Sequence, residues 1–348
     1  FFINYSIMAK SHIITGLDIG TNFIKTLVVK KTGKELEVIA NVQLPSFGLR
    51  KGVVVNVGET EKIIHSALSE AQRIYGNSIK SVFVNIQGSH IYAKLSHGLI
   101  SVSRADQKIS QEDIERVLQA TQAINLPSNQ EILDVIPQNF IIDSQKEIKE
   151  PLGLTGIRLE AKVILLICFS PALKSLTQAV LNNSLKIEDV IPSSIAASRA
   201  VLTPQQKELG VALIDIGAGT TGLTVFEEGE LIHFAVLPVG SGNITNDIAI
   251  GLKTEIDTAE KIKRQFGTCF LAEPKKEKKS KSRKKIEVSD KSSHLVFIPK
   301  TLVDIIKPRV SEIFFLVQKE LKKISRQELL PGGIVLTGGG AKLPQIVE

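Results

Sequence analysis

The chain has 348 residues, 43% of them apolar, with 25 glycines and 13 prolines, a length suited to about two domains and a composition that excludes a disordered, collagen-like or coiled-coil protein. Its two cysteines, Cys168 and Cys269, show no CxxC spacing, which excludes a disulfide framework or a thiolate metal site and suits the cytoplasm. Nine basic and three acidic residues between Pro274 and Lys291 carry nearly all of the net charge of +7, so we expect no nucleic-acid partner.

Strand and helix patterns alternate along the chain. Seven apolar residues from Val163 to Phe169 form the longest such run, well short of the about 20 that span a membrane. Ser110 and Asp113 have the spacing of a capping box, and Gly76-Asn77 ends a helical stripe. The patterns predict strands over 13–18, 26–30, 81–87 and 161–169 and helices over 59–75, 111–124 and from 170 onward. This alternation favours α/β lobes with mixed sheets.

One pattern occurs twice, 197 positions apart as measured from Asp18 to Asp215. Residues 17–29 and residues 214–226 each read as a strand, an aspartate, a hairpin of glycine and threonine or asparagine, and a second strand. The repeat predicts two related lobes.

Such hairpins can bind phosphate. Their backbone N–H groups and hydroxyls point into one concavity, where glycine permits positive φ and leaves room for phosphate oxygens. Asp18 and Asp215 can hold Mg²⁺ through water, and Lys25 supplies positive charge. Two hairpins facing each other would hold a triphosphate and make lobe closure depend on the nucleotide. The alternative is a pair of tight hairpins whose aspartates satisfy turn amides.

Two other nucleotide motifs are disfavoured. Residues 217–222 fit GxGxxG, but residues 223–229 read as a strand and turn, whereas a dinucleotide site requires a helix at that point. The chain contains no GxxxxGK[ST] sequence, so a P-loop is excluded.

A third glycine cluster, 338–340, follows a predicted buried strand and leaves backbone bare enough for a flat ring or a phosphate; the alternative is a tight strand-to-helix turn. Residues 240–249 begin a helix, and a second helix from about Thr258 carries Glu260 and Lys263 on one face. These two side chains suit ribose hydroxyls, or else form an exposed ion pair, which is the commoner arrangement.

With these motifs in place, the sequence resembles the actin-like ATPase superfamily, and within it the FtsA family of bacterial cell-division proteins, from about Ile13 to the end. Residues 136–143 and 151–161 look like the small domain inserted in that family, and residues 240–254 with 259–263 look like its nucleotide-lobe signature. The resemblance implies an α/β, actin-like (ribonuclease-H-like) two-lobed ATPase fold with a small inserted α+β domain.

The resemblance also implies how the chain is divided into domains. They are a disordered extension over 1–11, a first actin-like lobe over 12–88 and 169–205, the inserted domain over 89–168, a C-terminally incomplete second lobe over 206–242 and 300–348, and a nucleotide-side subdomain over 243–299 that contains a flexible basic insertion at 274–291. This insertion is either a solvated loop or a site that attracts an acidic partner tail or anionic lipid headgroups.

The resemblance also implies that the chain binds ATP and Mg²⁺. The implied site comprises the first phosphate loop (Asp18, Gly20, Thr21, Asn22, Lys25), the second (Asp215, Gly217, Gly219, Thr220, Thr221), the helix start at Gly240, the ribose contacts Glu260 and Lys263, and the adenosine loop Gly338, Gly339 and Gly340, with Asp18 and Asp215 holding the metal through water.

By the same resemblance, the protein assembles with itself on the inner face of the cell membrane at the division site. It binds the C-terminal tail of FtsZ, recruits later division proteins through the inserted domain, and reaches the membrane through a C-terminal helix beyond Glu348.

Two departures from the family pattern lower the expected activity. Gly222 stands where the second loop usually ends in Asp, and residues 191–198 offer no Glu or Gln to orient an attacking water. We therefore expect at most a slow ATPase and name no catalytic residue. Two alternatives on the same fold are a pilus-assembly actin homologue and a sugar-kinase-like phosphotransferase, although no convincing Asp base is found for the latter.

Overall fold

The computed structural model describes residues 11–270, 285–290 and 293–348. Contacts divide the chain into two compact units, Phe1–Gln87 with Ser170–Ala196 and Gly88–Phe169 with Ala197–Glu348. The predicted extension 1–11 lies outside the described residues except for Ser11, which begins the first strand. Most of the predicted insertion, 274–284 and 291, also lies outside them.

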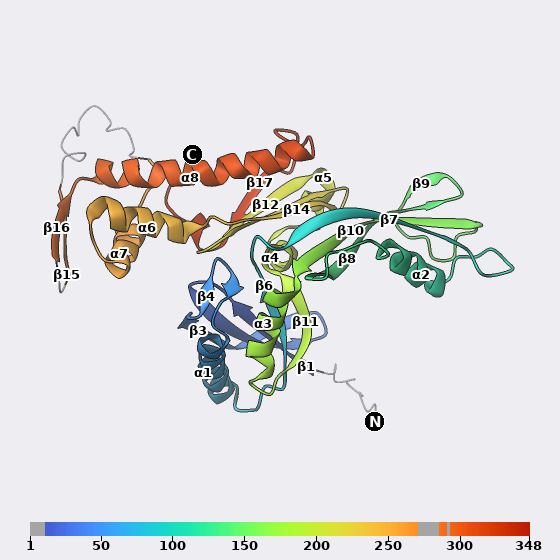
Figure 1. Ribbon diagram of the computed structural model, residues 1–348, viewed down its shortest axis with the longest axis horizontal. Coiled ribbons are helices and arrows are strands. Elements are labelled where there is room, and N and C mark those ends of the chain that lie inside the picture. The colour runs from blue at the N-terminus through green and yellow to red at the C-terminus, as the bar shows by residue number, and fades with distance from the viewer. Residues whose placement is uncertain (1–10, 271–284, 291–292) are drawn as a thin grey trace, which may run out of the picture. The chain divides into compact units, whose positions relative to one another are not determined.

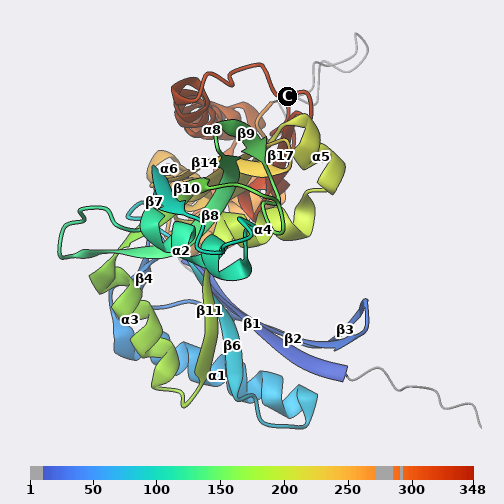
Figure 2. The same cartoon turned by 90° about the vertical axis from the view of Figure 1, so that its right-hand side faces the viewer.

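The first unit is built on one mixed sheet, as the alternating pattern predicted. Its strands lie in the order β11-β6-β1-β2-β3, which can be followed in Figure 2. β1, β2 and β3 form an antiparallel meander, whereas β6 runs parallel to both β1 and β11. The strands are β1 (Ser11–Ile19), β2 (Phe23–Thr32), β3 (Glu35–Pro45), β6 (Ser81–Ile86) and β11 (Lys186–Pro192), with a short separate hairpin of β4 (Leu49–Arg50) and β5 (Val53–Val54).

Two helices of the first unit pack together, α1 (Val57–Tyr75) and α3 (Ser170–Leu181). The Asn56 side chain caps α1 by accepting the Glu59 N–H at 3.1 Å. Gly76 ends α1 in the left-handed region at φ 78°, where glycine carries little strain. Most of the predicted stripe is buried, with Ile64, Ala67 and Ala71 fully covered, but Ile74 in its last turn is 46% exposed. A third helix, α4 (Ser193–Val201), runs from the first unit into the second.

The second unit begins with a four-stranded antiparallel sheet, ordered β7-β10-β8-β9, and one helix, α2. The predicted capping box is present, because Ser110 and Asp113 each bind the other's backbone N–H. The helix ends at Thr121 and not at Ile124, since the Gln122 and Ala123 N–H groups bond three residues back and tighten its last turn. The elements are β7 (Tyr92–Ser101), α2 (Gln111–Thr121), β8 (Gln130–Ile142), β9 (Gln145–Ile148) and β10 (Arg158–Phe169).

The rest of the second unit contains another mixed sheet, ordered β14-β13-β12-β17, and a layer of helices in which α6 packs against α7 and the long α8 (Figure 1). Its core joins alternate residues of β12 and β13 to the buried stripe of α8. The elements are α5 (Pro204–Leu209), β12 (Val211–Ile216), β13 (Thr221–Glu227), β14 (Glu230–Leu237), α6 (Ser241–Leu252), α7 (Ile256–Phe266), β15 (Ile286–Asp290), β16 (Ser293–Phe297), α8 (Pro299–Lys323), β17 (Ile334–Thr337) and a 3₁₀ turn over Gly340–Lys342. Among the described residues, none of the helices combines the length and the apolar composition of a membrane span.

The two mixed sheets share the same arrangement of four strands, to which the first sheet adds β11, and this likeness supports the internal repeat. In each, a three-stranded meander has a parallel strand beside its first member, β6 beside β1 and β17 beside β12. The two meanders are β1-β2-β3 and β12-β13-β14.

Two sequence predictions for the second unit were wrong. The predicted flexible insertion extends too far toward the C-terminus, because β15 pairs antiparallel with β16 over Ile286–Asp290. In β15, apolar Ile286 and Val288 alternate with polar residues, which is the period of a strand. The strand before the third glycine cluster is not fully buried, since Ile334 is 54% exposed. β17 lies at the edge of its sheet, where β12 is its one paired strand among the described residues.

Candidate functional site

The first hairpin joins β1 to β2, with the Gly20 N–H donating to the Phe23 carbonyl at 3.0 Å. Asp18 and Lys25 are cross-strand neighbours, and the Lys25 Nζ donates to Asp18 Oδ2 at 2.8 Å. Both side chains are about half exposed, at 45% and 47%. The carboxylate and the ammonium group therefore form a solvent-accessible pair at the mouth of the turn.

The remaining residues of the first loop are held by their surroundings. The Thr21 hydroxyl accepts the Gly52 N–H at 2.9 Å, and the Asn22 carbonyl accepts the Ser46 N–H at 3.0 Å. Gly20 is needed for space, since a Cβ there would lie 2.9 Å from the Phe23 carbonyl oxygen. The prediction that loop glycines serve positive φ was wrong for Gly20, Gly217 and Gly219, because none of them is among the described glycines with positive φ.

The second hairpin joins β12 to β13 and repeats the same turn, with the Gly217 N–H donating to the Thr220 carbonyl at 2.9 Å. Its cross-strand pair is Asp215 with Gly222, the position equivalent to Lys25 in the first hairpin. The two loops thus have the same turn hydrogen bond, but the first has a lysine paired with its aspartate and the second has a glycine there.

The two threonines of the second hairpin have different surroundings. The Thr221 hydroxyl is buried and donates to the Val239 carbonyl at 2.8 Å, so it fastens the hairpin to the segment that leads into α6. The Thr220 hydroxyl is also buried but has no hydrogen-bond partner among the residues that the structure describes. An unpartnered buried hydroxyl in a turn of N–H groups can serve an oxygen-rich ligand.

The third glycine cluster lies directly against the second hairpin, because β17 pairs with β12 and places Thr337 beside Asp215. Gly338 has φ 85°, and a Cβ on it would lie 2.5 Å from Asp215 Oδ1. A Cβ on Gly340 would lie 2.3 Å from Ile216 Cγ2, whereas one on Gly339 would meet nothing within 4 Å. Gly338 and Gly340 are therefore required by close packing against Asp215 and Ile216, and of the three glycines Gly339 faces open space.

Helix α6 starts on the second hairpin. The Ser241 and Gly242 N–H groups donate to the Gly217 and Ala218 carbonyls, both at 2.8 Å. A Cβ on Gly240 would lie 2.7 Å from these two carbonyl oxygens, and its N–H donates to Asn243 Oδ1 at 3.0 Å. The contacts of Gly240 within the chain are thus those of close packing, and two of the first N–H groups of α6 are already engaged.

Glu260 and Lys263 on α7 form a partly buried ion pair with a distance of 2.6 Å, with side chains only 23% and 11% exposed. Lys263 also donates to the Thr245 hydroxyl at 2.7 Å and to the Ser241 carbonyl at 3.1 Å, which ties α7 to the start of α6. Arg264 donates to Glu260 at 2.8 Å. The exposed ion pair considered as the alternative is therefore wrong in its exposure.

Burial sets the protonation behaviour of this pair. For Glu260, burial acts to raise the pKa of the carboxyl, but hydrogen bonds from Lys263 and Thr245 outweigh it, and the pKa falls below its ordinary value. For Lys263, burial lowers the pKa below its ordinary value despite the bond to Glu260. The carboxylate remains charged at neutral pH.

The structure thus gathers the predicted residues into two sets, one in each unit. The first-loop residues lie together in the first unit, and all the others lie in the second unit around β12. Within the described residues, no three His, Cys, Asp or Glu side chains form a metal cluster. The Thr220 hydroxyl, which has no partner among the described residues, and the open space at Gly339 near Asp215 fit a phosphate-bearing ligand with a hydrated cation.

Sequence reasoning missed several residues that shape these loops. Asn85 on β6 contacts Asp18, Gly52 binds Thr21, and Ser241 and Thr245 connect the second hairpin to α7. A polar Asn within the apolar strand 81–87 was the available signal for Asn85.

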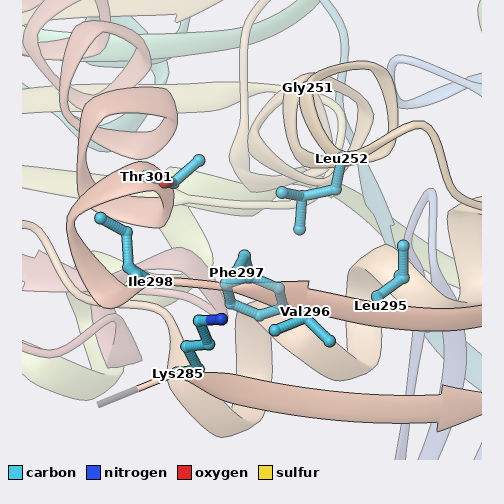
Figure 3. Close-up of a pocket in the computed structure, with 8 residues that line it drawn as sticks. All are labelled: Gly251, Leu252, Lys285, Leu295, Val296, Phe297, Ile298 and Thr301. Atoms are coloured by element: carbon cyan, nitrogen blue, oxygen red, sulfur yellow. The ribbon is translucent and has the colours of Figure 1, made fainter. Parts of the chain in front are cut away.

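A hollow lies apart in the second unit, between the end of α6, the β15-β16 hairpin and the start of α8, with a volume of about 560 Å³. Apolar side chains line it from both sides, and Lys285 adds a positive charge (Figure 3). Its apolar lining includes Leu252, Leu295, Phe297 and Ile298.

Comparison with known proteins identifies related sequences. Two family models match, "SHS2 domain inserted in FTSA" over residues 88–167 and "Cell division protein FtsA" over residues 212–348. Cell division protein FtsA of Pseudomonas aeruginosa is 41% identical over 96% of this chain and 79% of its own length, and that of Bacillus subtilis is 36% identical over 98% and 76%.

Solved structures show the fold. The PilM-PilN type IV pilus biogenesis complex matches with a TM-score of 0.66 at 18% identity, covering 96% of this chain and 83% of that one. MreB5 of Spiroplasma citri bound to ADP matches with a TM-score of 0.55 at 13% identity, covering 96% and 87%. The fold is therefore the actin-like fold with an SHS2 insertion, and the chain belongs to the FtsA family of cell-division proteins.

Proposed function

We propose that this protein binds ATP with Mg²⁺ through its two Asp-Gly-Thr loops and that the nucleotide governs its assembly at the division site. The observation that carries this proposal is the duplicated hairpin, with the same turn hydrogen bond at Gly20 and at Gly217. Both loops present backbone and hydroxyl groups that suit phosphate, and the MreB5 structure that shares the fold is described as bound to ADP.

Each loop contributes a different group to this proposal. Lys25 brings positive charge for phosphate oxygens, and the buried Thr220 hydroxyl has its hydrogen-bonding capacity left for the ligand. Asp18 and Asp215 would hold the hydrated Mg²⁺, which supplies charge neutralisation of the polyphosphate. Glu260 and Lys263 would meet the ribose and the 338–340 turn the adenine. Any ATP hydrolysis is slow, because residues 191–198 offer no Glu or Gln to orient water.

Equilibrium titration with Mg·ATP tests this proposal. Lys25→Ala removes one charge-assisted contact of about 1.5–3 kcal/mol, so the affinity should fall roughly tenfold or more. Asp215→Ala should weaken Mg·ATP while affecting metal-free ATP less. Lys31→Ala on the same strand is the matched control, because its side chain is exposed and outside the loop. Unchanged affinity in both loop variants would contradict the proposal.

The hollow beside β15 and β16 supports a docking role for the FtsZ tail. An apolar lining with Lys285 at hand suits a short peptide that carries apolar and acidic side chains. Lys285→Glu should weaken binding of the tail peptide in fluorescence anisotropy, whereas Lys300→Glu on α8 should not.

Removing residues 274–284, which leaves β15 in place, should reduce the salt dependence of binding if the basic tract attracts the tail; identical salt slopes would assign the tract to solvation alone.

Self-assembly, recruitment of later division proteins through the inserted domain, and attachment to the inner face of the membrane complete the proposal. Membership of the FtsA family supports all three. Sedimentation with and without ATP tests the first: nucleotide-dependent pelleting that Lys25→Ala abolishes would support it, and nucleotide-independent pelleting would contradict it. The pilus-assembly and sugar-kinase alternatives lose their support, because the family models and relatives are those of FtsA.

A further inference from the structure

Asn85 stands at the end of β6, next to the first loop, and makes three hydrogen bonds with one side chain. Its Nδ2 donates to Asp18 Oδ1 at 2.7 Å and to the Ser193 hydroxyl at 2.9 Å. Its Oδ1 accepts the Ile19 N–H at 2.6 Å. Asp18 and Asn85 are 67 positions apart and meet because β6 runs parallel beside β1.

These contacts leave the amide one orientation. Because Oδ1 must face the Ile19 N–H, the donating Nδ2 must face the carboxylate of Asp18. The Ser193 hydroxyl in turn donates to the Ile86 carbonyl at 3.3 Å, so its lone pairs remain for Asn85. The amide is thus braced on both sides by groups that belong to the sheet and to the start of α4.

Asp18 is consequently divided between two partners. Oδ1 accepts from Asn85 and Oδ2 accepts from Lys25, one on each neighbouring strand of β1. The bond from Lys25 is half exposed and can be exchanged for another partner, whereas Asn85 is partly buried and fixed by the backbone. Of the two, only Asn85 can hold the rotamer of Asp18 while Lys25 turns toward a ligand.

We propose that Asn85 is a positioning residue, which fixes the Asp18 carboxylate where it can hold the hydrated Mg²⁺ of the bound nucleotide. This inference rests on the proposed function. It assigns to Asn85 a role in metal dependence and not in nucleotide affinity as such, because its hydrogen bonds to the loop are to the Asp18 carboxylate and to the Ile19 N–H at the end of β1, ahead of the turn that begins at Gly20.

The experiment measures the ATP dissociation constant with Mg²⁺ and with EDTA, and takes the ratio of the two as the metal stimulation. Asn85→Ala removes the hydrogen bonds that orient Asp18, so the metal stimulation should fall about tenfold, while the metal-free affinity changes less than about twofold. Asn85→Asp keeps an acceptor for the Ile19 N–H but places a second carboxylate beside Asp18, so metal-free affinity should fall and the stimulation should rise.

The opposite directions of these two variants separate positioning from a purely structural role, which would weaken binding in both variants and both conditions alike. Ser193→Ala removes only the outer brace and should give a smaller fall than Asn85→Ala. Asn41→Asp, an exposed position on β3, adds the same charge to the same unit and should leave the stimulation unchanged. If Asn85→Ala does not fold, the Asp variant still decides by the direction of its change.

Parallel losses with and without Mg²⁺, or an unchanged stimulation in both variants, would overturn the role of Asn85 and leave the proposed function standing. Failure of the unaltered chain to bind ATP under either condition would overturn both.

Discussion

Substitution of Gly338 by alanine tests whether the third glycine cluster packs closely against Asp215. Gly338 has φ 85°, where an L-residue costs about 1–2 kcal/mol. The new Cβ would also lie 2.5 Å from Asp215 Oδ1 and 2.6 Å from the Ile216 carbonyl oxygen, and such overpacking adds roughly 1–3 kcal/mol. We therefore expect Gly338→Ala to lower the free energy of unfolding by about 3 kcal/mol.

The neighbouring glycine supplies the control. Gly339 has φ −65°, and a Cβ on it would meet nothing within 4 Å, so Gly339→Ala should be nearly neutral. Because the chain has no tryptophan, unfolding in urea is best followed by circular dichroism. For a chain of 348 residues the urea m value is about 3 kcal/mol/M or more, so a loss of about 3 kcal/mol corresponds to a midpoint shift of about 1 M or less. Equal midpoints for the two variants would refute the close approach of Gly338 to Asp215.

Three further predictions concern other buried polar groups. Lys263→Met leaves Glu260 partly buried without its closest cation and should lower the free energy of unfolding in urea by about 2–3 kcal/mol. A loss smaller than that of an exposed lysine variant would contradict the buried pair. Burial lowers the pKa of His233 on β14 below that of the unfolded chain, so the free energy of unfolding should decline as pH falls below about 6.5. His233→Gln should flatten that decline between about pH 7 and 5. An unchanged slope in the variant would argue against a lowered pKa of His233. Burial raises the pKa of Cys168 and Cys269 to about 11, so neither thiol should react with a thiol reagent at pH 8 until the protein is unfolded, and rapid native labelling would be inconsistent with their burial.

The repeated loop was predictable from sequence because all of its determinants are local. Asp18 and Asp215 each end a strand, and the turn that follows needs only glycine and a few small polar residues. The common topology of the two sheets followed from that likeness. The Ser110 capping box and the Gly76 helix end were readable for the same reason, since each depends on residues within four positions.

The features that escaped prediction depend on pairing between distant strands. Asn85 reaches Asp18 only through the parallel register of β6 with β1, and the exposure of Ile334 follows from the edge position of β17. Local alternation indicated β15 only weakly inside a lysine-rich tract, where charge dominated the interpretation. The roles of individual glycines required coordinates as well, because Gly338 serves backbone conformation and Gly20 serves space.

The start of α6 has a mechanical consequence. The carbonyls of Gly217 and Ala218 accept the first N–H groups of that helix, and the Lys263 ammonium group on α7 donates to the Ser241 carbonyl at the start of α6. A displacement of the loop therefore drags two helices with it, and α6 ends at Leu252, on the margin of the hollow near β16. Because α6 is one continuous helix from the loop to the hollow, we expect a shift of the loop to displace the lining at Gly251 and Leu252.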